Sequence, residues 1–155
     1  MTDRERDQLN VLVIDDDSSI RRLLVDIITR EEHQPVPART AEEGLELLPF
    51  WTFQVAFIDH RLPGMEGLVL GEYLRRNNPD MTIALVTAEG DVHLERKSRD
   101  LRITYIKKPF KVADIVAVLA ECIEAARERE QRRLRQEDEL FAPPISMYAD
   151  ELAAA

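Results

Sequence analysis

Polar side chains stand at the ends of four apolar stretches, and their types could together do chemistry. Asp15 and Asp16 come after LNVLVI, Asp59 ends VAFID, Thr87 ends TIALVT and Lys108 follows ITYIK. Neighbouring carboxylates repel one another, so this set calls for a cation. Carboxylate oxygens with room for water suit Mg²⁺, while a lysine and a hydroxyl suit phosphoryl oxygens. The residues therefore predict phosphoryl transfer to or from a carboxylate, driven by positioning and charge neutralisation.

The elements that must bring these residues together alternate between strand and helix up to about residue 126. LNVLVID, VAFID, TIALVT and ITYI are continuously apolar, which is typical of parallel strands buried on both faces. QPVPA is a weaker strand and belongs at an edge, because Pro35 and Pro37 cannot donate to a ladder. Such sheets bind ligands at the carboxyl ends of their strands. The pattern thus predicts an α/β fold with the polar residues gathered at that edge.

The segments between and after the strands are less uniform. SIRRLLVDIITREE has helical apolar spacing and a cap at Asp17 or Ser18. EGDVHLERKSRDLR barely has an apolar stripe, so it is either a poorly packed helix or a mobile segment. KVADIVAVLAECIEAA is amphipathic and continues without a breaker into REREQRRLRQEDE, which predicts an extended last helix. We therefore divide the chain into a domain at 1–126 and a charged helical extension with a proline-containing tail at 127–155.

Bulk composition excludes some classes of function. The 155 residues carry a formal net charge of −9, which gives nucleic acid no general electrostatic attraction. The apolar runs are too short to span a membrane, and the polar N-terminus lacks the core of a signal peptide. Cys122 is the single cysteine, which fits a reducing compartment. We expect a cytoplasmic protein that binds no nucleic acid directly and no membrane.

Four stretches, VLVIDDD, VAFIDHRLPGMEG, TIALVTAEG and TYIKKPF, resemble the receiver domains of two-component response regulators over roughly residues 9–126. Each motif is weak alone, but their order and spacing together are highly specific. The resemblance implies a five-stranded parallel sheet in the order 2-1-3-4-5 flanked by five helices. It also implies a signalling switch that accepts a phosphoryl group from a histidine kinase or a phosphotransfer protein. Such a switch catalyses its own phosphorylation and slow dephosphorylation, and it is not a dedicated turnover enzyme.

The resemblance assigns roles residue by residue. Asp59 matches the aspartate that accepts the phosphoryl group, and Lys108 matches the lysine that pairs with it. Asp16 would bind Mg²⁺ directly, Asp15 mostly through water, and Arg61 through its backbone carbonyl. The implied metal set is therefore Asp15, Asp16, Asp59 and Arg61.

Two further residues match the switch of the family. Thr87 would donate to a phosphoryl oxygen, and the ring of Tyr105 would swing inward when Thr87 moves. The charge change at Asp59 would then bias the face made by the fourth helix, fifth strand and fifth helix. That face or the extension would bind a downstream protein. A separate hypothesis is that Arg61 and Glu89 pair across the site mouth and slow the attack of water.

A rival enzyme class starts from the same acids. DDDSS also fits D-x-D-x-[S/T], the signature of haloacid-dehalogenase-type phosphatases, with Asp15 as nucleophile and Asp17 as general acid. That family needs an acidic pair soon after its lysine, and here the acid that follows Lys108 closely in sequence is the single Asp114. The reading also leaves Asp59 without a task. Asp17 is then better explained as the cap of the first helix.

The output of the chain has two interpretations. It is a single-domain regulator acting through protein contacts, or it is the receiver part of a longer transcription activator with a dimerising linker helix. A possible homodimer seam has apolar residues followed by charged ones: Val112, Val116, Leu119, Ile123 and Ala126, then Glu130, Arg133 and Glu137, then Leu140. The alternative is that the apolar part packs on the domain and the rest is a solvated helix.

Overall fold

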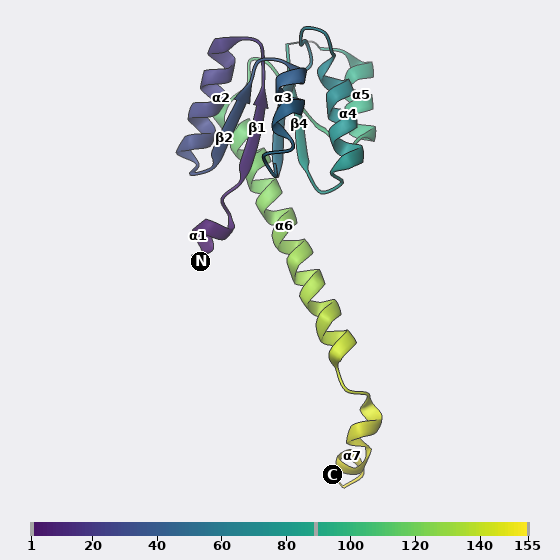
Figure 1. Cartoon of the computed structure of the whole chain (residues 1–155). Coiled ribbons are helices and arrows are strands. Elements are labelled where there is room, and N and C mark those ends of the chain that lie inside the picture. The colour runs from purple at the N-terminus through teal and green to yellow at the C-terminus, as the bar shows by residue number, and fades with distance from the viewer. Residues whose placement is uncertain (1, 89, 155) are drawn as a thin grey trace. The chain divides into compact units, whose positions relative to one another are not determined.

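The chain folds around a five-stranded parallel sheet in the order β2-β1-β3-β4-β5 (Figure 1). The computed structural model describes residues 2–88 and 90–154. Its strands are β1 (Asn10–Ile14), β2 (Gln34–Ala38), β3 (Val55–Asp59), β4 (Thr82–Thr87) and β5 (Thr104–Lys107). Its helices are α1 (Asp3–Arg6), α2 (Ser18–Arg30), α3 (Ala41–Leu47), α4 (Gly67–Asn77), α5 (Val92–Asp100), α6 (Val112–Phe141), the 3₁₀ helix η1 (Ile145–Tyr148) and α7 (Ala149–Ala153). The predicted strand order is confirmed.

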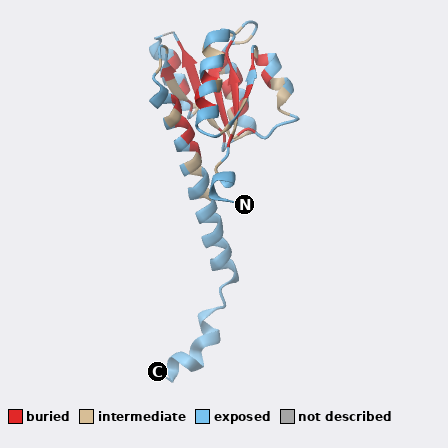
Figure 2. Ribbon diagram, turned by 90° about the vertical axis from the view of Figure 1, so that its left-hand side faces the viewer, coloured by how far each residue is buried: buried red, intermediate tan, exposed pale blue. Residues whose placement is uncertain are grey.

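The sheet is buried on both faces, as continuous apolar strands require (Figure 2). Because successive side chains of a strand point to opposite faces, β1 divides its residues between two core clusters. Val11 and Val13 join one cluster, and Leu12 and Ile14 join the other. All five residues of β3 are buried, including Asp59 at its end.

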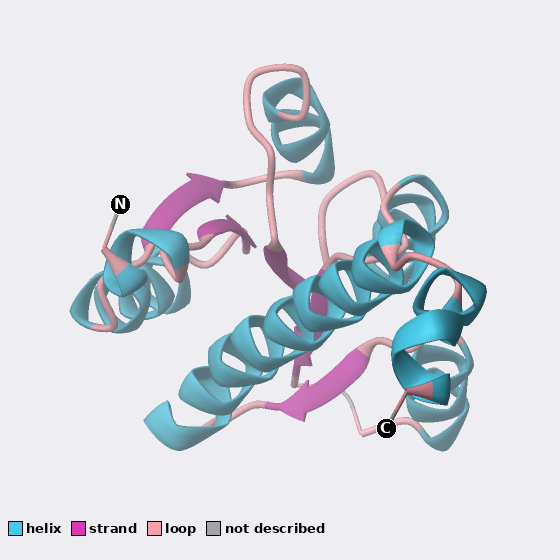
Figure 3. Cartoon of the chain, turned by 90° about the horizontal axis from the view of Figure 1, so that it is seen from below, coloured by secondary structure: helices cyan, strands magenta, loops and turns pink. Residues whose placement is uncertain are grey.

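Five helices cover these two faces, as predicted (Figure 3). The cluster that contains Val11 also holds Leu24 of α2 and Ile115 of α6. The cluster that contains Leu12 also holds Leu70 of α4 and Leu94 of α5, together with Ala41 at the start of α3. Two helices thus lie on one side of the sheet and three on the other.

The edge strand and the first sheet-covering helix follow the sequence expectations. β2 pairs with β1 and lies at the end of the strand order. An edge strand has a neighbour on one side, so the N–H groups that its two prolines lack are not needed for a second ladder. Asp17 caps α2, since its carboxylate accepts from the N–H of Ser19 at 2.8 Å and of Ile20 at 3.3 Å. These two bonds satisfy donors that the first turn of a helix leaves free.

The segment with the weak apolar stripe forms a helix, α5. Of the two predictions for this segment, the poorly packed helix agrees with the structure. Asp91 caps it by accepting from the N–H of His93 at 2.8 Å. Only Leu94 and Ser98 of its nine residues are buried. Few buried apolar contacts mark an element that opens at low free-energy cost.

Arg75 joins the end of α4 to two loops at the amino-terminal edge of the sheet. Its guanidinium donates to the carbonyls of Pro79 (2.9 Å), Met81 (2.6 Å), Leu101 (3.0 Å) and Arg102 (2.9 Å). Met81 directly precedes β4, and Leu101 and Arg102 follow α5. One side chain therefore satisfies four backbone acceptors.

The chain divides into two compact units after Ile123. The second unit contains the rest of the 30-residue helix α6, then η1 and α7. Among its described residues, 124–154, none is buried. Arg133 pairs with Glu130 at 2.7 Å and also with Glu137. Exposed large apolar side chains of this unit are Leu134, Leu140, Phe141, Ile145, Met147, Tyr148 and Leu152.

A membrane-spanning helix is absent from the part of the chain that the structure describes. The longest helix, α6, is rich in charged side chains beyond Ala126.

Candidate functional site

Three carboxylates meet at the carboxyl edge of the sheet. Ile14 of β1 lies beside Ile58 of β3, so the parallel register places Asp15 next to Asp59 just past these residues. Asp15, Asp16 and Asp59 each offer an oxygen within 4.8 Å of the other two. Asp15 is 1% exposed and Asp59 is 7% exposed, whereas Asp16 faces solvent. The sequence-predicted acidic residues therefore form one cluster with an open side.

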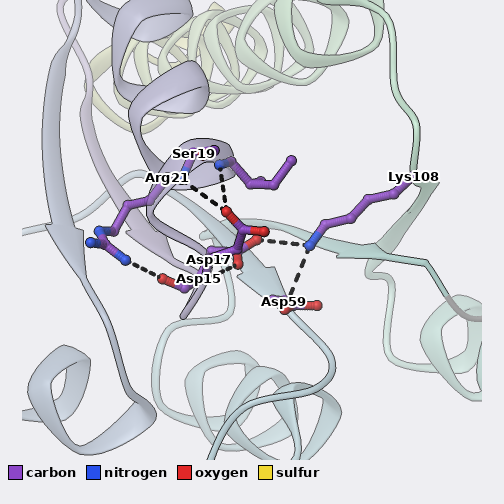
Figure 4. A network of polar contacts seen from close by, with 7 residues as sticks. Asp15, Asp17, Ser19, Arg21, Asp59 and Lys108 are labelled. Atoms are coloured by element: carbon purple, nitrogen blue, oxygen red, sulfur yellow. Dashed lines mark hydrogen bonds and ion pairs between the residues drawn. The ribbon is translucent and has the colours of Figure 1, made fainter.

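Asp15 has both carboxylate oxygens engaged (Figure 4). Its Oδ1 accepts from the N–H of Asp17 at 2.9 Å, and its Oδ2 accepts from Lys108 Nζ at 2.9 Å. Its backbone carbonyl accepts from the Arg21 guanidinium at 2.8 Å. With both oxygens held, Asp15 is suited to orienting Lys108.

Lys108 reaches the carboxylate of Asp59 as well as that of Asp15. Its Nζ lies 3.5 Å from Asp59 Oδ2. Burial and the charge of Asp15 raise the pKa of Asp59 to about 6, although Lys108 and the backbone N–H of Arg61 oppose the shift. Burial lowers the pKa of Lys108, but the hydrogen bond and charge of Asp15, together with Asp59, outweigh it and leave that pKa raised. Lys108 therefore stays positively charged beside Asp59.

The other predicted residues lie outside this cluster or beyond what the structure describes. Thr87 is buried at the end of β4, and its carbonyl accepts from the N–H of Lys108 at 2.8 Å. Tyr105 lies on β5 opposite Leu85 and packs, half-buried, against the core. Arg61 lies in the β3–α4 loop and lines a cavity of about 520 Å³ with Asp16. Glu89, the proposed partner of Arg61, falls outside the described residues.

His60, directly after Asp59, is a buried polar residue of the β3–α4 loop. Its side chain is only 9% exposed. Its Nδ1 is buried without a hydrogen-bond partner among the described residues. Its ring nitrogens do not join the acidic cluster, which comprises the three aspartates alone among the residues described. The position inside the β3–α4 junction, not the polarity of the ring, determines this burial.

Gly67 shows why the loop after Asp59 is tightly closed. Its N–H donates to the His60 carbonyl at 2.7 Å. A Cβ at this position would overlap the carbonyl oxygen of Asp59 and lie 2.8 Å from the Cα of His60. Only a glycine lets α4 begin directly against the end of β3. No local sequence pattern reveals this contact with Asp59.

The donor set fits Mg²⁺. All three side chains present oxygen, the ligand that this hard cation prefers, and the exposed Asp16 leaves space for water. No histidine or cysteine takes part in the cluster among the described residues, which disfavours a softer metal.

Comparison with known proteins identifies this arrangement. The family model of the response regulator receiver domain matches residues 11–120. The chain belongs to this family. A curated relative, the DNA-binding transcriptional regulator NtrC of Klebsiella pneumoniae, is 30% identical over 122 residues, which are 78% of this chain and 26% of that protein. This receiver chain thus spans about a quarter of the length of the NtrC proteins that it matches.

Solved structures agree with the receiver fold. A CheY-like receiver domain protein from Methanospirillum hungatei JF-1 has a TM-score of 0.73 and 29% identity, covering 78% of this chain and 98% of that one. NtrX from Brucella abortus has a TM-score of 0.72 and 24% identity, covering 88% of this chain and 35% of that one. At this lower identity, the NtrX likeness bears on the fold alone.

Proposed function

We propose that this receiver chain is a phosphorylation-dependent signalling switch with Asp59 as its phosphoryl acceptor. The observation that carries the proposal is the joint position of three carboxylates within 4.8 Å and a lysine ammonium 3.5 Å from Asp59. The donor would be the phosphohistidine of a histidine kinase or phosphotransfer protein, and the protein would work in the cytoplasm. We divide the chain into a receiver domain, residues 1–126, which contains Asp59, and a charged helical extension with a proline-containing tail, residues 127–155.

The chemistry follows from the groups in the cluster. A carboxylate oxygen of Asp59 attacks phosphorus, the P–N bond to the donor imidazole breaks, and the imidazole keeps the electron pair and takes a proton from solvent. With a pKa of about 6, Asp59 is mostly ionised at neutral pH and able to attack. Asp16, Asp59 and the Arg61 carbonyl would hold Mg²⁺, with Asp15 acting through water, and the cation would supply charge neutralisation. The ammonium of Lys108 would stabilise the negative charge of the transferred phosphoryl group.

The response to phosphorylation would pass through the end of β4. Thr87 would donate to a phosphoryl oxygen, and Tyr105 on the neighbouring strand would move inward. The side chains anchoring α5 are few, which supports a shift of that helix. The face formed by α5, β5 and α6 would then present a changed surface to a downstream protein.

A labelling experiment tests the acceptor. A radiolabelled acyl phosphate with Mg²⁺ should label the native chain and the Asp15→Asn variant to different extents, and should not label Asp59→Asn. Label retained in Asp59→Asn but lost in Asp15→Asn would instead support the haloacid-dehalogenase-type reaction. Two contacts speak against that reaction: both oxygens of Asp15 are engaged, and Asp17 is committed to the α2 cap.

A second candidate is that the chain is the receiver part of a longer transcription activator whose linker helix dimerises. The NtrC relatives, which are named as DNA-binding regulators and of which this chain matches 26%, favour it. The exposed side chains of α6 past Ile123 leave that helix free to pair with a second copy. Light scattering of the intact chain and of a chain lacking residues 127–155, each with and without beryllofluoride, tests it. An oligomeric state that the deletion leaves unchanged, both with and without beryllofluoride, would refute a dimerising role.

A further inference from the structure

Arg21 on the first turn of α2 contacts the acidic cluster through the backbone. Its Nη1 donates to the carbonyl oxygen of Asp15 at 2.8 Å (Figure 4). That carbonyl belongs to the peptide group that joins Asp15 to Asp16. The guanidinium therefore holds the short segment of backbone from which both acidic side chains project.

The two acids differ in how they are held. The Asp15 carboxylate has its own partners, the Asp17 N–H and Lys108. The Asp16 carboxylate is exposed and makes no hydrogen bond or ion pair with the residues described. Its position thus depends on the backbone at 15–16. The hydrogen bond from Arg21 restrains this backbone at the Asp15 carbonyl, and the Asp15 carboxylate restrains it at the Asp17 N–H.

Charge alone would give Arg21 the opposite effect on a metal. A fixed cation close to the carboxylates competes with Mg²⁺ for them, so its removal should tighten metal binding if charge were its only contribution. A restraint on Asp16 works the other way, because a ligand that is already placed loses less conformational freedom on binding. The sign of the effect therefore separates the two roles.

We propose that Arg21 is a positioning residue that presets Asp16 for Mg²⁺ by holding the Asp15–Asp16 peptide. This inference rests on the proposed function, since it takes the acidic cluster to be the Mg²⁺ site. Removal of a residue that orients a metal ligand through a hydrogen bond typically weakens metal binding by about 10-fold or more. Arg22, the next residue on α2, is exposed and supplies a control with the same change of charge.

The test compares Arg21→Met with Arg22→Met by titrating Mg²⁺ into each protein and following the backbone amide resonances of Asp16 and Asp17 by NMR. We expect the dissociation constant to rise by about 10-fold in Arg21→Met and to stay level or fall slightly in Arg22→Met. Equal or tighter binding in Arg21→Met overturns the proposal. Native protein that binds no Mg²⁺ would instead overturn the proposed function.

A measurement without metal tests the same contact independently. Loss of the hydrogen bond to the Asp15 carbonyl should change the ¹⁵N chemical shift of the Asp16 amide in Arg21→Met. The same chemical shift should stay unchanged in Arg22→Met. Arg21→Gln replaces Arg21→Met in both measurements if the methionine variant fails to fold. Its donor lies two bonds closer to the backbone, so we expect the same loss of the hydrogen bond to the Asp15 carbonyl. A lowered melting temperature with unchanged Mg²⁺ affinity would mean that Arg21 serves only stability.

Discussion

Lys108 donates a hydrogen bond to Asp15 across 93 residues of sequence, with 2.9 Å between Nζ and Oδ2. The same ammonium lies farther from Asp59, at 3.5 Å. Asp15 therefore acts as the holder of the lysine, and this leaves Asp59 the less tightly engaged carboxylate of the two. A nucleophile benefits from that division, since an oxygen tied in a short ion pair attacks poorly.

The first prediction concerns this holder. Asp15→Asn should weaken Mg²⁺ binding by about 10-fold and lower the pKa of Asp59, because the charge of Asp15 helps to raise it. Asp17→Asn is the matched control: it makes the same change of charge next to the cluster, and asparagine caps helices as well as aspartate does. Carboxyl-carbon NMR titration measures the pKa. An Asp59 pKa that rises in Asp15→Asn would contradict the assignment.

The second prediction is a pH dependence of stability in a chelator. The pKa of Asp59 is about 6 in the folded chain against 3.8 for the free group, so the folded state binds this proton more tightly than the unfolded state. The free energy of unfolding should therefore fall as pH rises from about 4 to about 6. Asp59→Asn should lose this component and be more stable at neutral pH by on the order of 2 kcal/mol. Urea unfolding at several pH values measures it, and a less stable Asp59→Asn protein at neutral pH would contradict it.

The third prediction concerns the close approach of α4 to β3. Gly67→Ala should destabilise the domain by at least about 2 kcal/mol and reduce phosphorylation, because the new methyl group displaces the backbone of Asp59. Gly71→Ala is the control on the same helix. There the added carbon meets the flexible end of Ile103 at 3.0 Å and a methyl group of Ile83 at 3.9 Å, and no backbone atom. Chemical unfolding and the labelling assay report the two effects, and equal stabilities of the two variants would rule out the contact as a constraint.

The fourth prediction uses the orphaned nitrogen of His60. A buried polar atom without a partner costs on the order of 1 kcal/mol or more, so His60→Leu should raise the free energy of unfolding by about 1 kcal/mol. His93→Leu changes an exposed histidine on α5 and should alter stability by less than about 0.5 kcal/mol. Thermal and urea unfolding measure both. A destabilised His60→Leu protein would mean that the imidazole has a role in the resting state.

The sequence predicted the sheet well because strands buried on both faces leave an unmistakable signal. VAFID needs no neighbour to be read as a central strand, and the acids at the strand ends then meet at one edge by geometry alone. EGDVHLERKSRDLR was ambiguous for a physical reason: two buried side chains, Leu94 and Ser98, anchor its helix, too few for a periodic pattern.

Other features of the site depend on contacts that no local pattern encodes. The burial of His60 arises from the β3–α4 junction, which a hydropathy scale does not register. The bond from Arg21 to the Asp15 carbonyl joins a side chain to backbone, so the accepting residue carries no sign of it. The closeness of Gly67 to Asp59 appears only once the strand and the helix are packed together.

Arg75 and the two loops that it contacts should differ in their tolerance to substitution. The four atoms that accept from its guanidinium are all backbone carbonyls, and every amino acid supplies one. Substitutions at residues 79, 81, 101 and 102 can therefore accumulate without loss of these bonds. Lysine cannot reproduce a planar fork that serves several acceptors at once. Among descendants of this sequence we expect arginine to persist at position 75 while the loops that it ties together drift.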